Sequence, residues 1–212
     1  MRKNVLILSV LGLALMGCFG GHTSPKSRFY GLYAPAVTQT RGPVAQTNVV
    51  IESVTVPQSV ARPQMVVRQN DSTEITVAEF DRWIEGLDNA LPVVISENMN
   101  AYAKNINARP ARIGTRKAAK YTVSVEFVRF DTVANGDITL AAWWMITNER
   151  GDVLVQKKNT LTAKTPMTSG APNYNAIVAE QSHLVARLSY KIADTIATLK
   201  ETYKTSPRLG RY

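Results

Sequence analysis

The sequence predicts an α+β domain in which two long helices pack on one face of a mostly antiparallel sheet. Two patterns point to this class. Apolar and polar residues alternate through the middle of the chain, and apolar residues recur at intervals of three and four in two other stretches. Size is the third observation, because 212 residues with 45% apolar side chains suffice for one domain with a proper core.

The chain begins with a pattern typical of a bacterial export signal. A short basic start precedes an apolar run over residues 5–16, which is shorter than the roughly 20 residues that a membrane-spanning helix needs. Gly17 then precedes Cys18, the only cysteine of the chain. This arrangement resembles a lipobox, which implies cleavage of a signal peptide of residues 1–17 and a diacylglycerol on the Cys18 thiol. The alternative is an ordinary cleaved signal followed by an incidental cysteine.

An acylated Cys18 attaches the rest of the chain to a membrane surface. Each buried methylene contributes about 0.8 kcal/mol, so several acyl chains hold a protein firmly where a single chain would exchange. Residue 19 is Phe and not Asp. By resemblance to proteobacterial lipoproteins, this departs from the inner-membrane retention signal and indicates the outer membrane, with the chain facing the periplasm.

Residues 18–46 are expected to form a lipidated N-terminus and a tether. Gly and Pro recur in this stretch, and only residues 28–33, which are rich in aromatic side chains, favour a short strand. The single folded domain is expected over residues 47–204. Residues 205–212 are expected to form a disordered tail.

The first part of the domain favours strands. Residues 49–56 are rich in β-branched side chains and are followed by Pro57, which predicts a strand. Residues 64–68 and 74–76 flank Asn70 and Asp71, two residue types that tolerate a left-handed turn. This stretch predicts a small hairpin.

A helix is predicted to follow the hairpin. Thr76 and Glu79 have the spacing of a capping box, in which a hydroxyl and a carboxylate satisfy N–H groups at a helix start. Apolar residues then recur at intervals of three and four as far as residue 106, interrupted by Pro92, where the helix kinks or restarts. The helix is expected to end before Pro110.

The middle of the domain predicts three antiparallel strands. Residues 121–127 alternate strictly between apolar and polar, and Asn135 and Gly136 favour a tight turn. Two further strands are predicted over residues 138–147 and 153–163. The first of these two places one apolar set on a single face: Ile138, Leu140, Ala142, Trp144 and Ile146.

The last element is predicted to be a long amphipathic helix. Asn173 or Asn175 caps its start, and Ser206 with Pro207 ends it. Its apolar residues recur at intervals of three and four: Leu184, Leu188, Ile192, Ile196, Leu199 and Tyr203.

The formal net charge of +9 fits several kinds of partner. The positive residues are scattered or lie in the C-terminal tail, and the sequence contains no known nucleic-acid-binding motif, so no nucleic acid is expected. The charge fits a phospholipid surface or an acidic protein face, and equally a surface that is merely solvated.

The sequence shows no recognisable catalytic or cofactor motif. Its two histidines are His22, in the expected tether, and His183, which has only Glu180 at helical spacing. A GxSxG elbow, a paired-histidine metal motif and a phosphate-binding glycine loop are all missing from the sequence. Most acidic residues between positions 71 and 88 suit a helix start or a helix face. We therefore expect no enzymatic activity, no cofactor and no metal.

Trp143 and Trp144 are neighbours in a predicted strand, so they point to opposite faces of the sheet. One indole is expected in the core and the other on the far face. An exposed Trp next to Met145 fits a protein interface, where aromatic and Met residues are enriched. The alternative is that the tether or another strand covers it.

One stretch carries a more specific pattern. Pro57 is followed by Arg-Pro-Gln at residues 62–64 and by Arg-Trp-Ile-Glu-Gly-Leu at residues 82–87. This stretch resembles the PqiC (YmbA) lipoproteins, also called ABC-type transport auxiliary lipoproteins. Gly86 stands where that family more often has proline. The resemblance covers residues 18–199 in layout, and residues 57–87 carry its motif.

The resemblance implies an outer-membrane lipoprotein that serves an MCE-domain protein and its inner-membrane permease. Such systems move phospholipid or other hydrophobic molecules between the two membranes and help to maintain envelope integrity. The resemblance also implies a ring-forming homo-oligomer. The alternative function is a lipoprotein ring or plug subunit of another envelope assembly or secretion machine, and an exported hydrolase is a third.

Four residues are candidates for contacts with a partner or another subunit. They are Arg62, Arg68, Arg82 and Trp143. For the arginines there is a structural alternative, in which Arg82 or Arg62 pairs with Glu85. For Trp83 the structural interpretation is preferred, with its indole closing the edge of the core.

Overall fold

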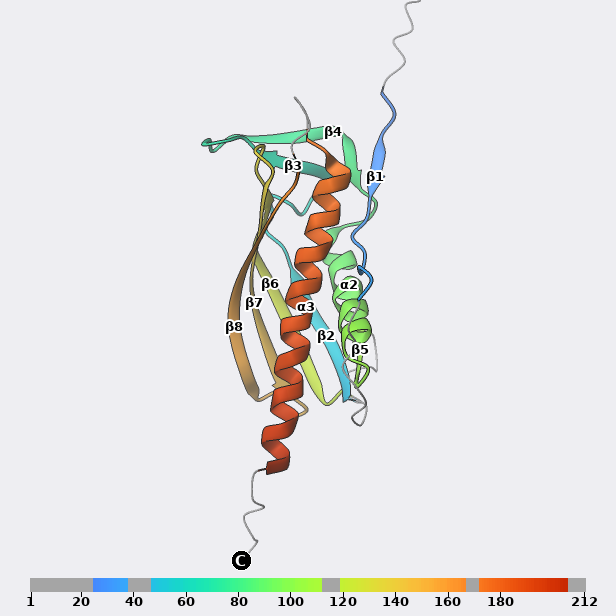
Figure 1. Ribbon diagram of the computed structural model, residues 1–212, viewed down its shortest axis with the longest axis vertical. Helices are drawn as coiled ribbons and strands as arrows, with labels where there is room; N and C mark the ends of the chain where they lie inside the picture. The colour runs from blue at the N-terminus through green and yellow to red at the C-terminus, as the bar shows by residue number, and fades with distance from the viewer. Residues whose placement is uncertain (1–24, 38–46, 112–118, 167–171, 206–212) are drawn as a thin grey trace, which may run out of the picture.

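The structure, a computed structural model, describes residues 25–37, 47–111, 119–166 and 172–205. The expected signal peptide at residues 1–17, Cys18 and the tail from residue 206 lie outside the described residues. Within them the chain forms two sheets and two helices (Figure 1). The predicted α+β class is confirmed.

The larger sheet has five strands in the order β5-β2-β6-β7-β8. β2 (Thr47–Thr55) pairs in parallel with β5 (Ile106–Pro110) on one side and with β6 (Tyr121–Thr132) on the other. β7 (Asp137–Asn148) and β8 (Val153–Lys164) continue from β6 as an antiparallel meander. The three strands predicted in the middle of the chain are confirmed, and each is longer than the alternation predicted.

Tight turns join the meander. Gly136 between β6 and β7 has a φ of 89°, and Gly151 between β7 and β8 has a φ of 88°. Side chains other than glycine rarely adopt this left-handed region, so glycine suits both turns. The turn expected at Asn135 and Gly136 is therefore confirmed.

The smaller sheet has three strands in the order β1-β4-β3 and lies at one end of the molecule (Figure 1). β3 (Gln64–Arg68) and β4 (Ile75–Trp83) form the predicted hairpin, in which Asp71 takes the left-handed conformation with a φ of 48°. β1 (Arg28–Tyr30) pairs in parallel with the second half of β4. The short strand expected within residues 28–33 is thus present.

Part of the expected tether packs on the folded body. Besides the pairing of β1, Leu32 contacts the core, the Tyr33 N–H donates to Ser182 Oγ over 3.3 Å, and Pro35 is buried. Within residues 18–46, the described residues 28–37 therefore belong to the body.

The helix prediction between residues 76 and 109 is wrong at both ends. Residues 76–83 continue strand β4, and α2 (Leu87–Tyr102) begins after Gly86, which makes no side-chain capping bond. Ile106, expected on the helix stripe, begins strand β5. Residues 76–83 pair with β3 on one side and with β1 on the other. These two strand pairings stabilise the segment more than a capping box at Thr76 and Glu79 would stabilise a helix start, so the segment forms a strand.

α2 passes through Pro92 as one helix, so the helix does not restart at this residue. α3 (Tyr174–Thr205) is the long C-terminal helix, and the side-chain oxygen of Asn173 accepts the Ala176 N–H over 3.2 Å. Of the two capping candidates, Asn173 is therefore the one that acts.

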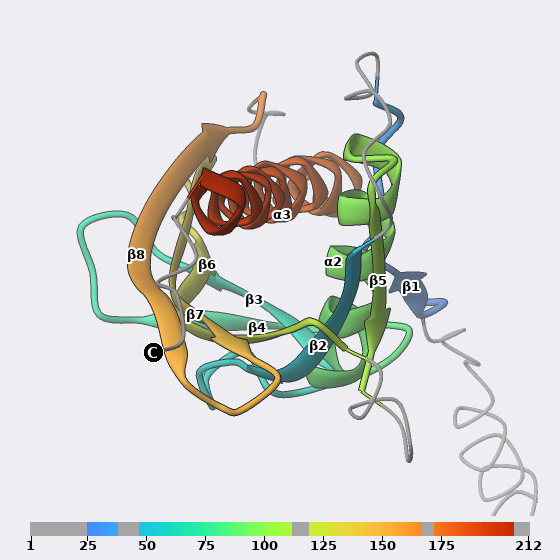
Figure 2. The ribbon, with the colours of Figure 1, turned by 90° about the horizontal axis from the view of Figure 1, so that it is seen from below.

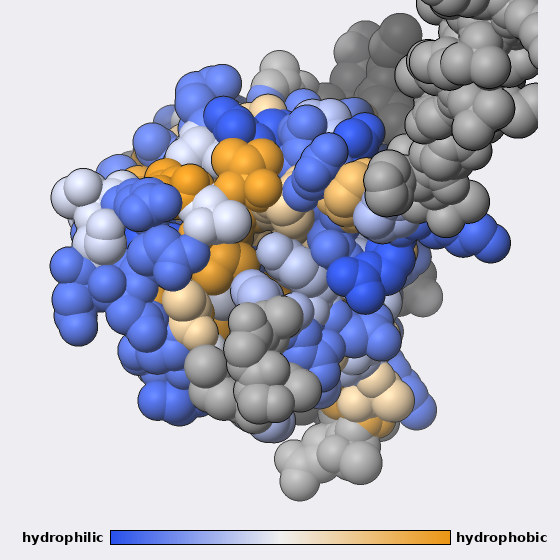
Figure 3. Space-filling model, turned by 90° about the horizontal axis from the view of Figure 1, so that it is seen from above, coloured by the Kyte–Doolittle hydropathy of each residue, from blue (hydrophilic) through white to orange (hydrophobic). Residues whose placement is uncertain are grey.

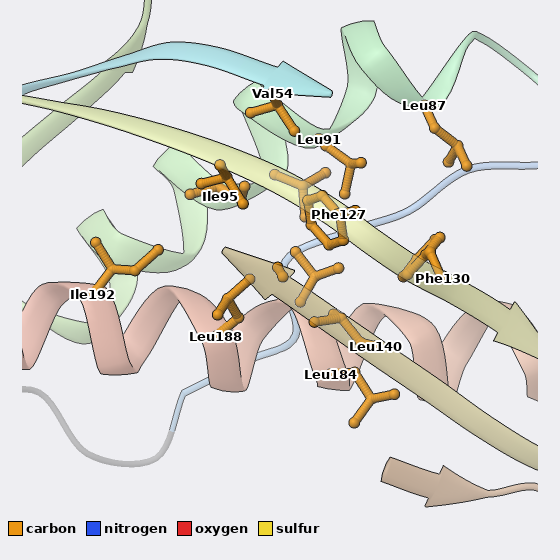
Figure 4. Close-up of a cluster of buried hydrophobic side chains, with 14 of the residues drawn as sticks. Val54, Leu87, Leu91, Ile95, Phe127, Phe130, Leu140, Leu184, Leu188 and Ile192 are labelled. Atoms are coloured by element: carbon orange, nitrogen blue, oxygen red, sulfur yellow. The ribbon is translucent and has the colours of Figure 1, made fainter. Parts of the chain in front are cut away.

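Both helices lie on the concave face of the five-stranded sheet, as predicted (Figure 2). α2 covers β2 and β5, whereas α3 faces β7 and β8. The core between them includes Leu184, Leu188 and Ile192 of α3 and Leu91 and Ile95 of α2, all 0% exposed (Figure 4). Each such fully buried side chain contributes about 1.5–3 kcal/mol. The core thus holds the two helices against the five-stranded sheet, and the three-stranded sheet lies at one end of this body.

Candidate functional site

The three-stranded sheet brings the three candidate arginines to one end of the molecule. Gln64 of β3 and Arg82 of β4 are register partners, Arg62 lies two residues before β3, and Arg68 is its last residue. Nothing in the spacing of 20 residues between Arg62 and Arg82 predicts this proximity. It follows from the β3–β4 hairpin.

Arg68 is held by an ion pair. Its Nη2 lies 2.5 Å from Asp131 Oδ2 on β6, and Arg129 approaches the same carboxylate at 3.1 Å. The Arg68 carbonyl oxygen also accepts the Ala134 N–H over 2.8 Å. These bonds tie the smaller sheet to the end of β6, so Arg68 serves the fold.

Arg62 and Arg82 have no acidic partner among the described residues. Arg82 donates to the Glu79 carbonyl oxygen over 3.3 and 3.4 Å, and Arg62 is exposed. Neither forms the ion pair with Glu85 that was the structural alternative. Both guanidinium groups therefore retain donors for another molecule.

A groove of about 490 Å³ opens beside Arg62. Its apolar wall consists of Val54, Val56, Trp83, Ile84 and Leu87, and Glu85 and Asp88 stand among its polar residues. The indole of Trp83 is only 7% exposed, so it closes the edge of the core as expected. The groove thus joins an apolar wall to charged side chains of both signs, as protein interfaces do.

An ion pair that the sequence did not indicate holds β1 in place. Arg28 Nε and Nη2 donate to the two carboxylate oxygens of Asp81 over 2.7 and 2.9 Å, and the Tyr30 hydroxyl donates to Oδ1 over 2.8 Å. Burial, and then the hydrogen bond to Asp81, raise the pKa of Tyr30. Burial also raises the pKa of Tyr174, whose ring centroid lies 6.2 Å from that of Tyr30. Since 53 residues separate Arg28 from Asp81, spacing carries no signal for this pair.

Trp143 and Trp144 face opposite sides of β7, as the alternation predicts. Trp144 is 2% exposed and its Nε1 donates to Asn159 over 2.8 Å, whereas Trp143 is 41% exposed on the convex face of the sheet. The Lys158 ammonium lies 5.6 Å from the centroid of the Trp143 ring. No strand of the described chain covers Trp143, which forms a second exposed surface away from the three arginines.

Among the described residues, the remaining titratable side chains do not gather into a cluster that could bind a metal ion. In the described ranges, no three His, Cys, Asp or Glu side chains lie close enough to hold a metal ion. His183 is exposed on α3. No helix of the described chain is long and apolar enough to cross a membrane.

The fold of this chain is similar to that of two solved structures. A crystal structure described only as an uncharacterized protein has a TM-score of 0.65 and 19% identity, covering 81% of this chain and 99% of its own. A protein from Xanthomonas campestris has a TM-score of 0.64 and 16% identity, covering 84% and 100%. The PelC dodecamer from Paraburkholderia phytofirmans reaches a TM-score of 0.38 at 12% identity, covering 70% and 93%, and supports no conclusion about assembly. The first two likenesses establish the fold alone.

The family follows from the sequence. No curated protein matches this chain. Residues 30–193, however, match the sequence model of the family described as ABC-type transport auxiliary lipoprotein component. Since these residues are well over half of the 212, the chain belongs to the ABC-type transport auxiliary lipoprotein component family.

Proposed function

We propose that the protein is a non-enzymatic accessory subunit of an MCE-type system that moves phospholipid or other hydrophobic molecules between two membranes and so helps to maintain envelope integrity. The observation that carries the proposal is the family match over residues 30–193, on a chain whose only cysteine follows a short apolar run. Family membership supports a transport auxiliary lipoprotein. The MCE partner and the transported class are the parts that we add.

The anchor in this proposal is acylated Cys18 in the outer membrane, with the folded body in the periplasm. Phe19 supports this placement, since the inner-membrane retention signal carries Asp at that position. The pairing of β1 with β4 supports a short link between anchor and body, because β1 begins at Arg28, ten positions after Cys18.

The partners in this proposal are an MCE-domain protein, its inner-membrane permease and further copies of this chain. Two surfaces fit such contacts. The first is Arg62 with Val54 and Val56 in the groove, and the second is the convex sheet face around Trp143. Aromatic and Arg side chains are enriched among the residues that dominate protein interfaces.

A non-enzymatic role is supported by the way in which charged residues are used. Asp81 and Asp131 form ion pairs that join strands, and His183 is an exposed helix residue. General acid–base catalysis needs such groups to converge on a pocket. Here Asp81 joins β1 to β4, and Asp131 joins the smaller sheet to β6.

Purification from membranes tests the proposal. The full lipidated chain, carrying a C-terminal tag, is solubilised from its own membranes, and the proteins that accompany it are identified by mass spectrometry. Recovery of an MCE-domain protein and its permease supports the proposal. Recovery of a secretion or β-barrel assembly machine without an MCE-domain protein contradicts it and favours the ring or plug subunit.

Matched variants assign the contact surface. Arg62→Glu and Trp143→Ala are expected to lower the recovered MCE-domain protein, because both side chains are exposed. Arg150→Glu is the control, since Arg150 is an exposed arginine in the turn between β7 and β8. Equal recovery with all three variants would show that the contact lies elsewhere.

A further inference from the structure

The three-stranded sheet has one buried face and one exposed face. Met65, Val67 and Trp83 point inward, at 3%, 2% and 7% exposure. The outward residues of β3 and β4 come together through the register partners Val66 with Val77 and Gln64 with Arg82. We call this exposed surface the cap face. Its strongly exposed apolar members are Phe29 at 59%, Ile75 at 46%, Val77 at 42% and Ile84 at 68%.

Phe29 and Ile84 lie near each other on this face. Phe29 of β1 is the register partner of Arg82, and Ile84 lies two positions beyond Arg82, so the three share one side of the sheet. Gly31 leaves room for the Ile84 side chain, since a Cβ at Gly31 would lie 3.3 Å from Ile84 Cγ2. These are the two most exposed large apolar side chains among the described residues. Exposed apolar side chains that lie together, rather than scattered singly, are the kind of surface that interaction sites use.

Figure 3 looks onto this end of the molecule and shows apolar side chains grouped between hydrophilic ones. The charged residues near them have both signs, and Glu79 and Glu85 are exposed carboxylates. Arg28 and Arg68 are neutralised by Asp81 and Asp131, whereas Arg82 bonds only a backbone carbonyl and lies beside Phe29. The cap face therefore offers apolar side chains beside the Arg82 guanidinium, which has no acidic partner among the described residues.

The proposed lipid anchor limits how far this face can lie from a membrane. Arg28 follows Cys18 by ten positions, and an extended chain covers at most about 3.5 Å per position, so the start of β1 lies within about 35 Å of the Cys18 backbone. β1 stands at the same end as β3 and β4 (Figure 1). The 32 residues of α3 at 1.5 Å each extend about 48 Å toward the opposite end. The tether thus favours the cap face over the far end at the membrane.

We propose that the cap face docks on the membrane leaflet that holds the lipid of Cys18. Phe29, Ile84, Ile75 and Val77 enter the boundary between headgroups and acyl chains, and the Arg82 guanidinium donates to lipid phosphate oxygens. The five-stranded sheet and both helices then stand away from the membrane. The inference rests on the proposed lipidation of Cys18 and adds an orientation to it.

A single engineered thiol tests the orientation. In the lipidated chain the sulfur of Cys18 is a thioether, so a cysteine placed at residue 29 or 84 is the only free thiol. Phe29→Cys, Ile84→Cys and Val153→Cys are labelled with an environment-sensitive fluorophore and reconstituted into vesicles of phosphatidylethanolamine and phosphatidylglycerol, with or without doxyl-labelled lipid. Val153 is the matched control, because it is 57% exposed and begins β8 at the opposite end of the sheet.

The proposal expects a blue shift and quenching by doxyl lipid at positions 29 and 84, and neither effect at position 153. Quenching that is equal at all three positions would overturn it, as would unquenched labels on a chain that still floats with the vesicles. A blue shift without doxyl quenching, growing with protein density, would instead assign the face to a second copy. A chain that carries no lipid and does not float would overturn both this inference and the lipid anchor, so the two failures are distinguishable.

Discussion

The Arg28 guanidinium donates to both carboxylate oxygens of Asp81, with Nε–Oδ1 and Nη2–Oδ2 distances of 2.7 and 2.9 Å. Asp81 is 6% exposed and also accepts the Tyr30 hydroxyl, so one buried carboxylate binds two side chains of β1. Charge-assisted and bidentate bonds of this kind are the stronger ones in proteins. Through them the segment next to the expected anchor is fixed to the folded body.

Asp81→Asn is expected to destabilise the fold by about 1–3 kcal/mol, because a buried acceptor of two donors loses its charge. Urea unfolding measures the free energy, and hydrogen exchange of the β1 amides measures local release. Glu79→Gln is the control, since Glu79 is an exposed carboxylate of the same strand. Loss of stability of the same size in both variants would show that the buried pair has no special role.

Alkaline pH is expected to weaken the fold through Tyr30. Burial and the hydrogen bond to Asp81 raise its pKa above the ordinary value of 10.0, so the unfolded chain releases this proton at a lower pH than the folded chain does. The stabilisation of the folded state by protonated Tyr30 is fully present below pH 10.0. It is lost as the pH rises through the pKa that Tyr30 has in the folded protein. Denaturation midpoints between about pH 8 and about pH 11 measure the loss.

The variant Tyr30→Phe is expected to show a shallower alkaline loss, because the group that titrates is removed. Tyr33→Phe, which changes an exposed tyrosine three positions on, serves for comparison. Identical pH profiles for wild type and Tyr30→Phe would refute this origin of the pH dependence.

Leu188→Ala is expected to cost about 2–5 kcal/mol, because Leu188 is 0% exposed and its truncation leaves a cavity between α3 and the sheet. His183→Ala on the exposed side of the same helix is expected to change stability by less than about 0.5 kcal/mol. Urea unfolding of both variants measures the difference. A large loss for His183→Ala would contradict its placement as a surface residue.

Acrylamide quenching is expected to report Trp143 almost alone. The chain has three tryptophans, of which Trp83 and Trp144 are 7% and 2% exposed and Trp143 is 41% exposed. Trp143→Phe is expected to remove the part of the fluorescence that acrylamide quenches. Trp144→Phe is expected to keep that part but to lower the free energy of unfolding by about 1–3 kcal/mol, because Asn159 loses the N–H donor of the indole. Strong quenching that persists in Trp143→Phe would contradict the burial of the other two.

Cys18→Ala is expected to abolish palmitate labelling and association with the membrane fraction, because the acylated sulfur is the anchor in our proposal. Fractionation and metabolic labelling of the full chain measure both. Ser24→Ala, which leaves the residues around Cys18 unchanged, is the comparison. Unchanged labelling of the alanine variant would refute lipidation at this position.

Strands and helices with strong periodicity were predictable from the chain. The buried face of β7 and that of α3 as far as Ile196 were correct, since Leu140, Trp144, Leu184 and Leu188 are buried as the periods of two and of three to four require. Residues 76–83 were not predictable in this way. Their apolar spacing fits a helix, but in the fold these residues form β4, which pairs with β3 on one side and β1 on the other. The spacing of apolar residues within a segment gives no information about such partners elsewhere in the chain.

The candidate site was predictable in part. The motif around residues 57–87 indicated Arg62, Arg68 and Arg82, but not that Asp131 neutralises Arg68 while Arg82 is left beside Phe29. The ion pair between Arg28 and Asp81 was missed altogether, because a tether was expected where β1 packs.

By itself the sequence determined the family, the α+β class and the buried faces of the long elements, because periodicity and short motifs are local properties of a chain. Only the tertiary structure decided which charges are neutralised and which apolar side chains stay exposed. Those outcomes depend on strands that are distant in sequence and meet when the three-stranded sheet closes over the end of the core, as Arg28 and Asp81 do across 53 positions.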